Sequence, residues 1–187
     1  MVLVSTGSGV LVVPIGGGAS KTIDTAGFMG QVVAGGAAAV YSTTAGTLRR
    51  SSTTAPSPTT LASSFGGFYA ISPAQSTVLY YQNDSATGTD LFLASAVTLG
   101  TPRTVSAVMN GVVNGDAFTA DSTYALGGLR FGRADIESVN LAVSTTPTRI
   151  VSHADAVLDL SPAGDQMIYS WTVTPGPLAG IYVTPIP

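Results

Sequence analysis

The chain has very few of the residues on which many sites and folds depend. Its 187 residues include no cysteine, one histidine, one lysine and one glutamate. The absence of cysteine excludes disulfides, thiolate metal sites and cysteine nucleophiles. Helix surfaces are usually built from Lys, Glu, Arg and Gln, so the scarcity of Lys and Glu argues against helices. No run of about 20 apolar residues is present, so we expect no membrane-spanning helix.

Charge is also scarce, at 9% of residues with a net charge of −3. The seven basic residues are scattered, and Arg49-Arg50 is their one adjacent pair. A pair is too small for the basic surface that a nucleic acid requires. We therefore expect no nucleic-acid partner and interpret the pair as a solvated strand edge, which charges protect from aggregation.

The residues that are abundant favour β-structure. The chain is 45% hydrophobic, with 22 glycines and 11 prolines, and Ser and Thr supply most polar positions. Such a composition suits the exposed faces of strands. It is also commoner in exported bacterial proteins than in cytosolic ones. Met1 leads into Val2-Leu3-Val4 without the basic segment of a signal peptide. We expect a periplasmic or extracellular protein whose targeting segment lies outside these residues.

One short phrase recurs along the chain. Ile-Ser-Pro at 71–73 returns as Leu-Ser-Pro at 160–162, and in both copies the serine precedes a tyrosine by eight residues. Weaker copies lie at 32–41 and 118–126. Taking Val33, Ser72, Thr119 and Ser161 as equivalent gives spacings of 39, 47 and 42 residues. Those spacings match a four-stranded propeller blade, roughly 40–50 residues, whereas ankyrin and tetratricopeptide repeats are shorter and helical.

Each repeat is expected to contain up to four short strands, called a to d in chain order. Short β-branched and aromatic runs bounded by Gly, Pro, Asn and Asp are typical of hairpin-connected strands. The segment Ser51–Ser64 is interpreted as a long loop between strands c and d of one repeat, a linker being the alternative. The expected strands are 68–71, 77–82, 90–94 and 103–106 in the clearest repeat, and 2–4, 10–13, 21–24, 59–63, 139–143, 148–152 and 181–183 elsewhere.

These observations predict an all-β fold, a β-propeller of four-stranded antiparallel blades. We expect one repeat domain over residues 1–187, with units at about 1–28, 29–65, 66–108, 109–153 and 154–187. The first unit lacks strand a and the last lacks strand d, which predicts an incomplete ring of about five blades, the first and last partial. Open blades leave apolar edges uncovered, so self-association is expected.

Residues 149–169 resemble one repeat of the WD40-like propeller family, whose best-known member is the TolB C-terminal domain. The family's repeat contains an apolar-Ser-Pro-Asp-Gly turn followed by an apolar-aromatic strand. Residues 160–169 match it, with Ala163 in place of the usual Asp, and the copy at 72–75 keeps Ser-Pro and lacks Asp-Gly. The Ser side chain is expected to bond the backbone of this tight turn, and Pro presets its φ.

The one histidine lies among possible catalytic partners. Ser152, Asp155, Asp159 and Ser161 are close to His153 in sequence, and together they contain the groups of a Ser-His-Asp hydrolase. His153 falls, however, in the expected connection between strands d and a, and WD40-type repeats often place a histidine there to bond within the blade. We expect no catalytic residue, no cofactor and no metal site, because one His with carboxylates is a thin ligand set.

Other stretches carry weaker signals. Residues 83–90 are rich in side-chain oxygen like a calcium loop, but Ala94 occupies the twelfth position, so an Asx-rich hairpin is expected. Gly16–Gly18 before Lys21 lacks the first glycine of a phosphate loop and leads into no helix. The strand aromatics are interpreted as packing between blades, a ligand-binding cluster being the alternative. They are Trp171, Tyr80, Tyr81 and Tyr169.

Fold alone does not choose among functions, since propellers host enzymes, scaffolds and binders. The resemblance implies a non-catalytic binding or scaffold module, TolB-like, that recognises a protein or an envelope component through loops on one rim. One alternative is the gating propeller of a prolyl-oligopeptidase-type peptidase, for which a Gly-x-Ser-x-Gly elbow elsewhere in the gene would decide. A phage or surface structural β-protein is a third.

Overall fold

The protein is described by a computed structural model of residues 1–187. The residues it describes are 1–84, 88–95, 103–106, 118–119, 121–127, 134–142, 148–171 and 179–186. The chain forms two compact units, one of Met1–Asp84 with Phe92–Pro102 and one of Ser85–Leu91 with Arg103–Pro187. Within the described ranges the helical content is one 3-10 turn, η1 (Ala34–Gly36). In the same ranges, no helix is long and apolar enough to cross a membrane.

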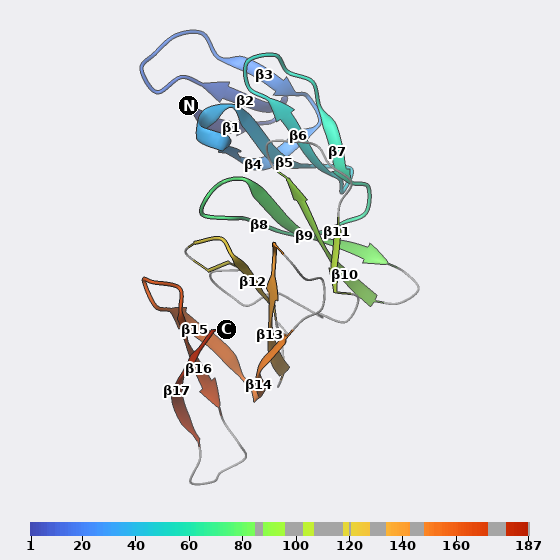
Figure 1. The fold of residues 1–187 in the computed structure, drawn as a ribbon. Helices are drawn as coiled ribbons and strands as arrows, with labels where there is room; N and C mark the ends of the chain where they lie inside the picture. The colour runs from blue at the N-terminus through green and yellow to red at the C-terminus, as the bar shows by residue number, and fades with distance from the viewer. Residues whose placement is uncertain are drawn as a thin grey trace. The chain divides into compact units, whose positions relative to one another are not determined.

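All strands belong to five antiparallel sheets, which we name A to E in chain order (Figure 1). Sheets B and C have four strands each, in the order of the chain, as the predicted blades require. Sheet A is β1 (Val2–Thr6), β2 (Gly9–Val13) and β3 (Lys21–Asp24); sheet B is β4 (Gly27–Val33), β5 (Ala38–Thr43), β6 (Leu48–Ser52) and β7 (Thr59–Ala62); sheet C is β8 (Phe65–Ile71), β9 (Thr77–Asp84), β10 (Gly88–Ser95) and β11 (Arg103–Ser106).

Sheets D and E have three described strands each. Phe118, the expected end of strand a in the fourth repeat, lies in a single β-bridge. Ile71 and Leu160 end the a strands of two different sheets, as the repeat alignment predicts. Sheet D is β12 (Tyr124–Gly127), β13 (Ala134–Asn140) and β14 (Thr148–Ala154); sheet E is β15 (Ala156–Leu160), β16 (Gln166–Trp171) and β17 (Gly180–Pro185).

The strand prediction is wrong in one place in sheet D. We expected strand c of the fourth repeat to begin at Val139, but β13 begins at Ala134. The charges of Asp135 and Glu137 conceal the strand in the sequence. In the structure Ile136 between them is buried, and the Asp135 carboxylate lies 2.8 Å from the Arg149 guanidinium on β14. The long loop is confirmed, because residues 53–58 connect β6 to β7 within sheet B.

Neighbouring sheets bury apolar faces against each other. The cluster between sheets A and B contains Val10, Val12, Ile23, Ala39 and Tyr41. The cluster between sheets B and C contains Val33, Ala38, Val40, Leu48, Leu61, Ala62, Val78 and Tyr80. In the second compact unit, Ile136 and Ala154 of sheet D pack against Met167 of sheet E, together with Ile186. The core therefore consists of separate layers between sheets, as expected for stacked repeats.

Candidate functional site

Three of the four copies of the repeated phrase form the same turn between strands a and b, whereas the copy at 32–41 forms the 3-10 turn η1, in which Ala37 donates its backbone N–H to the Ala34 carbonyl oxygen. We call the three the repeat turns; they lie at 72–77, 119–123 and 161–166. In each, the residue three positions after the leading Ser or Thr donates its backbone N–H to that residue's carbonyl oxygen. The donors are Gln75 (2.7 Å), Ser122 (2.8 Å) and Gly164 (2.8 Å).

Side-chain oxygens hold the turns closed. The Ser72 hydroxyl accepts the backbone N–H of Thr77 at 3.1 Å. The Ser161 hydroxyl accepts the N–H groups of Asp165 and Gln166 and donates to the Asp165 carboxylate at 2.7 Å. Such bonds satisfy backbone groups that the turn leaves unpaired. The prediction that the repeat's serine bonds its own turn is therefore confirmed.

The repeat turn at 119–123 uses a carboxylate for the same purpose. The Asp121 carboxylate accepts the hydroxyls of Thr119 and Thr123, both at 2.6 Å, and the backbone N–H of Thr123 at 2.9 Å. The hydrogen bond from Thr119, followed by those from Thr123, lowers the pKa of Asp121 to about 2. Three donors favour the ionised form, so this carboxylate is an acceptor and not a general acid at neutral pH.

The repeat turns also share a left-handed backbone residue. It has φ of 55° at Gln75, 63° at Ser122 and 74° at Gly164. Glycine adopts this region without cost, whereas Gln and Ser are strained there. Gln75 gains a compensating contact, because its side-chain oxygen accepts the N–H of Gly35 at 3.1 Å. This bond joins the repeat turn of sheet C to η1, the equivalent turn of sheet B.

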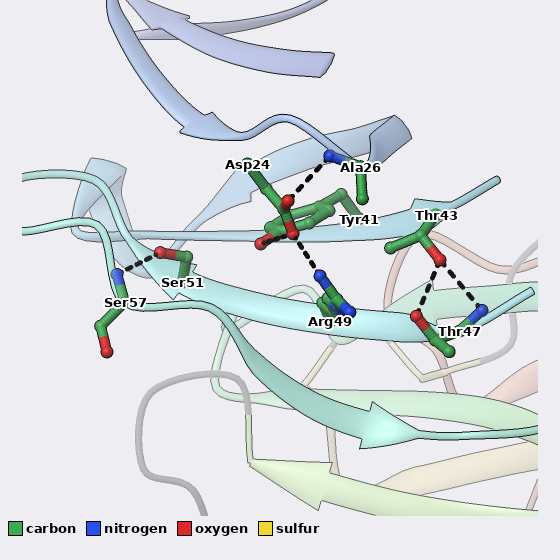
Figure 2. Close-up of polar contacts among 8 residues, drawn as sticks. All are labelled: Asp24, Ala26, Tyr41, Thr43, Thr47, Arg49, Ser51 and Ser57. Carbon is green, nitrogen blue, oxygen red and sulfur yellow. Dashed lines mark hydrogen bonds and ion pairs between the residues drawn. The ribbon is translucent and has the colours of Figure 1, made fainter. Parts of the chain in front are cut away.

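The carboxylate of Asp24, at the end of β3, lies in a polar network between sheets A and B (Figure 2). The Asp24 side chain is 7% exposed. One carboxylate oxygen accepts the N–H of Ala26 at 2.8 Å, and the other accepts the Tyr41 hydroxyl at 3.0 Å and lies 2.8 Å from the Arg49 guanidinium. Asp24 thus connects sheet A to two strands of sheet B.

The pKa values within this network move in opposite directions. Burial raises the pKa of the Asp24 carboxyl, but the hydrogen bonds from Ala26, Arg49 and Tyr41 outweigh it and hold the value below its usual range. Burial, reinforced by the nearby Asp24 charge, raises the pKa of the Tyr41 hydroxyl well above its usual range. At neutral pH the carboxylate is ionised and the tyrosine protonated. This arrangement stabilises structure and offers neither a general base nor an activated nucleophile.

Smaller polar contacts stabilise the edges of sheet B (Figure 2). The Thr43 and Thr47 hydroxyls lie 2.8 Å apart across the β5–β6 turn. The buried Ser51 hydroxyl accepts the N–H of Ser57 at 2.9 Å, which ties the β6–β7 loop to β6. Like the Asp24 network, these contacts order the backbone.

His153 does not lie where the sequence predicted. It belongs to β14, one residue before its end, and not to a connecting turn. Its side chain is exposed, its φ is 59°, and its backbone N–H donates to the Asp135 carboxylate at 3.3 Å. The expected hydrogen bond of the imidazole within the blade is not found among the described residues. An irregularity in the β13–β14 register displaces the end of this strand.

Two other members of the possible triad, Ser161 and Asp159, use their side chains in bonds to the backbone. The Ser161 hydroxyl is part of its repeat turn, and the Asp159 carboxylate accepts the N–H of Leu160 at 2.8 Å. Asp155 donates its backbone N–H to Ser170. Across the described ranges, no three His, Cys, Asp or Glu side chains are grouped as metal ligands. That no site residue exists in the whole chain stays a prediction.

The interpretation of Arg49-Arg50 as a strand edge is wrong. Both lie on β6, which is flanked by β5 and β7. Arg49 reaches the Asp24 carboxylate, so a partner about 25 positions away in sequence, which spacing could not reveal, explains it. Gly16–Gly18 forms part of the loop from β2 to β3 and leads into a strand, as expected.

Two of the strand aromatics, Tyr80 and Tyr169, pack between sheets, as predicted. Tyr80 is fully buried, and its hydroxyl donates to the Leu61 carbonyl at 2.9 Å. Tyr169 packs against the core between sheets D and E and stacks on Tyr182, with 5.6 Å between the two ring centroids. Trp171 is half-buried and lies 5.9 Å from Tyr182. The side chains of Tyr81 and of residues 83, 84 and 90 lie outside the described part, so the calcium-loop alternative is not tested.

Solved structures share this fold, although no family model and no curated protein matches the sequence. TolB from Agrobacterium tumefaciens has a TM-score of 0.54 and 20% identity over 82% of this chain and 56% of its own. TolB from Acinetobacter baumannii has a TM-score of 0.53 and 11% identity, and the match covers 98% of this chain and 52% of that structure. A eukaryotic initiation factor has a TM-score of 0.58 and 15% identity, and the match covers 99% of this chain and 48% of that structure.

The chain spans about half the length of these structures. Identities this low establish the fold alone. Together with the five antiparallel sheets they confirm the predicted fold class, part of a β-propeller of TolB-like type. The chain is thus a propeller module.

Proposed function

We propose that this propeller module is a non-catalytic binding protein that recognises another protein through its repeat turns. The observation that carries the proposal is that these turns are closed by their own side chains. The Ser72 and Ser161 hydroxyls hold the backbone, while residues 73–76 of the first turn and Pro162, Ala163 and Asp165 of the other stay exposed. Loops already in their bound conformation lose little entropy on binding, which favours recognition.

The exposed tips have the chemistry of a contact surface and lack that of a reaction. Pro73-Ala74 and Pro162-Ala163 are exposed, rigid and uncharged. Asp121 and Asp165 next to the locked positions add single negative charges, both satisfied within their turns. The Ser161 hydroxyl and the Asp159 carboxylate both bond backbone groups of their own segments, which supports a module without catalysis. The membership of the WD40-like family and a single domain over all 187 residues belong to the same proposal.

The proposal is tested by replacing Ala74 or Ala163 with a photo-crosslinking amino acid in the producing cells. Ala55, exposed in the β6–β7 loop, is the matched control because it is also an alanine outside the repeat turns. We expect one protein to be crosslinked from the turn positions and not from position 55. Crosslinks to envelope glycan or lipid alone would make the partner an envelope component, and crosslinks only from position 55 would refute recognition by the turns.

We further propose that the module acts in the periplasm or outside the cell. Support comes from the low charge, 9% of residues, and from the composition rich in Ser, Thr and Gly, which is commoner in exported bacterial proteins than in cytosolic ones. Fractionation of the producing cells tests this, and recovery of the protein in the cytosol would contradict it.

A further inference from the structure

The b strands show which face of a sheet points to which neighbour. Tyr41, Tyr80 and Tyr169 occupy equivalent repeat positions, and each packs in the cluster with the preceding sheet. The residue before the tyrosine points to the opposite face, because side chains alternate along a strand. Val40, one such residue, packs in the cluster with the following sheet. Every observed layer therefore joins the following-side face of one sheet to the preceding-side face of the next.

Sheet E has an uncovered following-side face. Ile168 is the equivalent of Val40 and Leu79, which are both 0% exposed, yet Ile168 is half-exposed. Its cross-strand partner Val183 is 61% exposed, and Ile181 on the same face is 71% exposed. These three form the face we call E-out, with the exposed Asp159 at its margin.

Sheet A has an uncovered preceding-side face. Its other face, with Leu3, Val10 and Val12, packs against sheet B. Val2 pairs with Val13, and Val4 pairs with Leu11, so all four side chains lie on the face directed away from sheet B. Val2 is 50% exposed and Val4 is 39% exposed, and Leu11 and Val13 are partly exposed. These four form the face we call A-out.

We propose that A-out of one copy of the chain packs on E-out of a second copy. In each described layer, an apolar following-side face is covered by an apolar preceding-side face. E-out is a following-side face and A-out is a preceding-side face. E-out is therefore expected to pack on A-out of another copy, and neither face is expected to pack on a second copy of itself. Both are surfaces of branched aliphatic side chains whose removal from water favours association. The contact is heterologous, and head-to-tail assembly follows from it.

Light scattering and sedimentation of the full chain over a concentration series test the proposal. We expect wild-type protein to associate beyond a dimer as concentration rises. Val4→Lys, on A-out, and Val183→Lys, on E-out, should each weaken association at least about tenfold, because each introduces a charge into an apolar contact, where burial of a charge is costly. Ile15→Lys is the matched control, since Ile15 is 78% exposed in the β2–β3 loop and lies on neither face; it should associate as wild type.

Mixing the two variants provides the decisive measurement. Val4→Lys retains E-out and Val183→Lys retains A-out, so an equimolar mixture should form a dimer and nothing larger. The same dimer should form when Val183→Glu takes the place of Val183→Lys in the mixture, because the substituted residue 183 lies outside the contact that joins the two variants. Circular dichroism and Trp171 fluorescence verify that each variant is folded. A monomeric wild type at high concentration, or undiminished association in either single variant, would overturn the proposal; a monomer would assign the faces to other parts of a longer chain.

Discussion

Replacing Asp24 with alanine is expected to destabilise the first compact unit by about 3 kcal/mol. The change leaves the hydroxyl of Tyr41, a fully buried residue, without its acceptor, and an unsatisfied buried group costs about 1–3 kcal/mol. It also removes the acceptor of the Ala26 N–H, worth about 1 kcal/mol. Arg49 is 30% exposed, so solvent compensates most of its loss and we count about 0.5 kcal/mol for that pair.

Asp24→Asn separates the charge from the hydrogen bonds. The amide oxygen can still accept the Ala26 N–H, so a smaller loss of about 1–2 kcal/mol is expected. The exposed Asp159, whose carboxylate also accepts a backbone N–H, provides the matched control. Asp159→Asn should change the free energy of unfolding by less than about 0.5 kcal/mol, as usual for surface substitutions.

Urea unfolding followed by circular dichroism gives the free energies, and hydrogen exchange over residues 38–52 locates the effect on β5 and β6. Because the Asp24 pKa is lowered in the folded protein, its stabilisation is present above about pH 4 and is lost as pH falls below that value. Asp24→Asn should therefore flatten the acid side of the stability profile. A loss below about 1 kcal/mol for Asp24→Ala, or an unchanged acid side in Asp24→Asn, would refute the reasoning.

Four further outcomes are expected in the same unfolding experiments. Gly164→Ala should cost about 1–2 kcal/mol because φ is 74° there, whereas Ser122→Gly, at 63°, should be neutral or stabilising by up to about 1 kcal/mol; the reverse order would contradict the turn geometry. Ser138→Ala should cost less than about 0.5 kcal/mol, since this buried hydroxyl has no hydrogen-bond partner among the described residues, and a loss above about 1 kcal/mol would show that it has one. His153→Gly should stabilise by up to about 1 kcal/mol, because it relieves a φ of 59° and removes no imidazole bond; destabilisation would restore a structural role for the ring. Tyr41→Phe should reduce the loss of stability that wild type shows as pH rises above about 10, because the raised pKa of Tyr41 stabilises the fold below that pH, while the raised pKa of Tyr80 leaves part of the loss in place; an unchanged alkaline side would assign the loss to other groups.

The limits of a strand were predictable where turn-forming residues in the sequence separate it from its neighbours. The strands Lys21–Asp24 and Arg103–Ser106 have the predicted limits, and β9 and β14 begin where expected. In each case Pro, Gly or Asp ends one run and a β-branched run starts the next, which are local signals. The β13 strand was missed at its start because Asp135 and Glu137 interrupt the apolar pattern. Their compensation, such as the pairing of Asp135 with Arg149, depends on a strand that lies later in the chain.

The polar network could not be predicted, because its members share no local pattern. Asp24 ends β3, and Arg49 lies on β6 in the next sheet. Only the stacking of sheets brings the two together, and spacing along the chain carries no trace of it. The left-handed backbone at His153 has the same origin, since it follows from a register irregularity between β13 and β14. The periodicity of the sequence indicates the strands and turns within each repeat. The Asp24–Arg49 pair and the left-handed backbone at His153 depend instead on how strands pair and pack, which the periodicity does not indicate.

The equivalent tyrosines show how far a repeat determines chemistry. Tyr41, Tyr80 and Tyr169 all lie eight residues after the reference position and all face the preceding sheet. Tyr41 donates to a carboxylate, Tyr80 donates to a backbone carbonyl, and Tyr169 stacks on Tyr182. Burial alone raises the pKa of Tyr80 to about 12, whereas the Asp24 charge adds to burial at Tyr41. The repeat thus determines the place and direction of the ring, while the surroundings of each ring determine what it contacts: a residue of the preceding sheet for Tyr41 and Tyr80, and Tyr182 of its own sheet for Tyr169. For the same reason the β-propeller fold was predictable from one strong phrase, and the contacts that would define a binding site had to come from the structure.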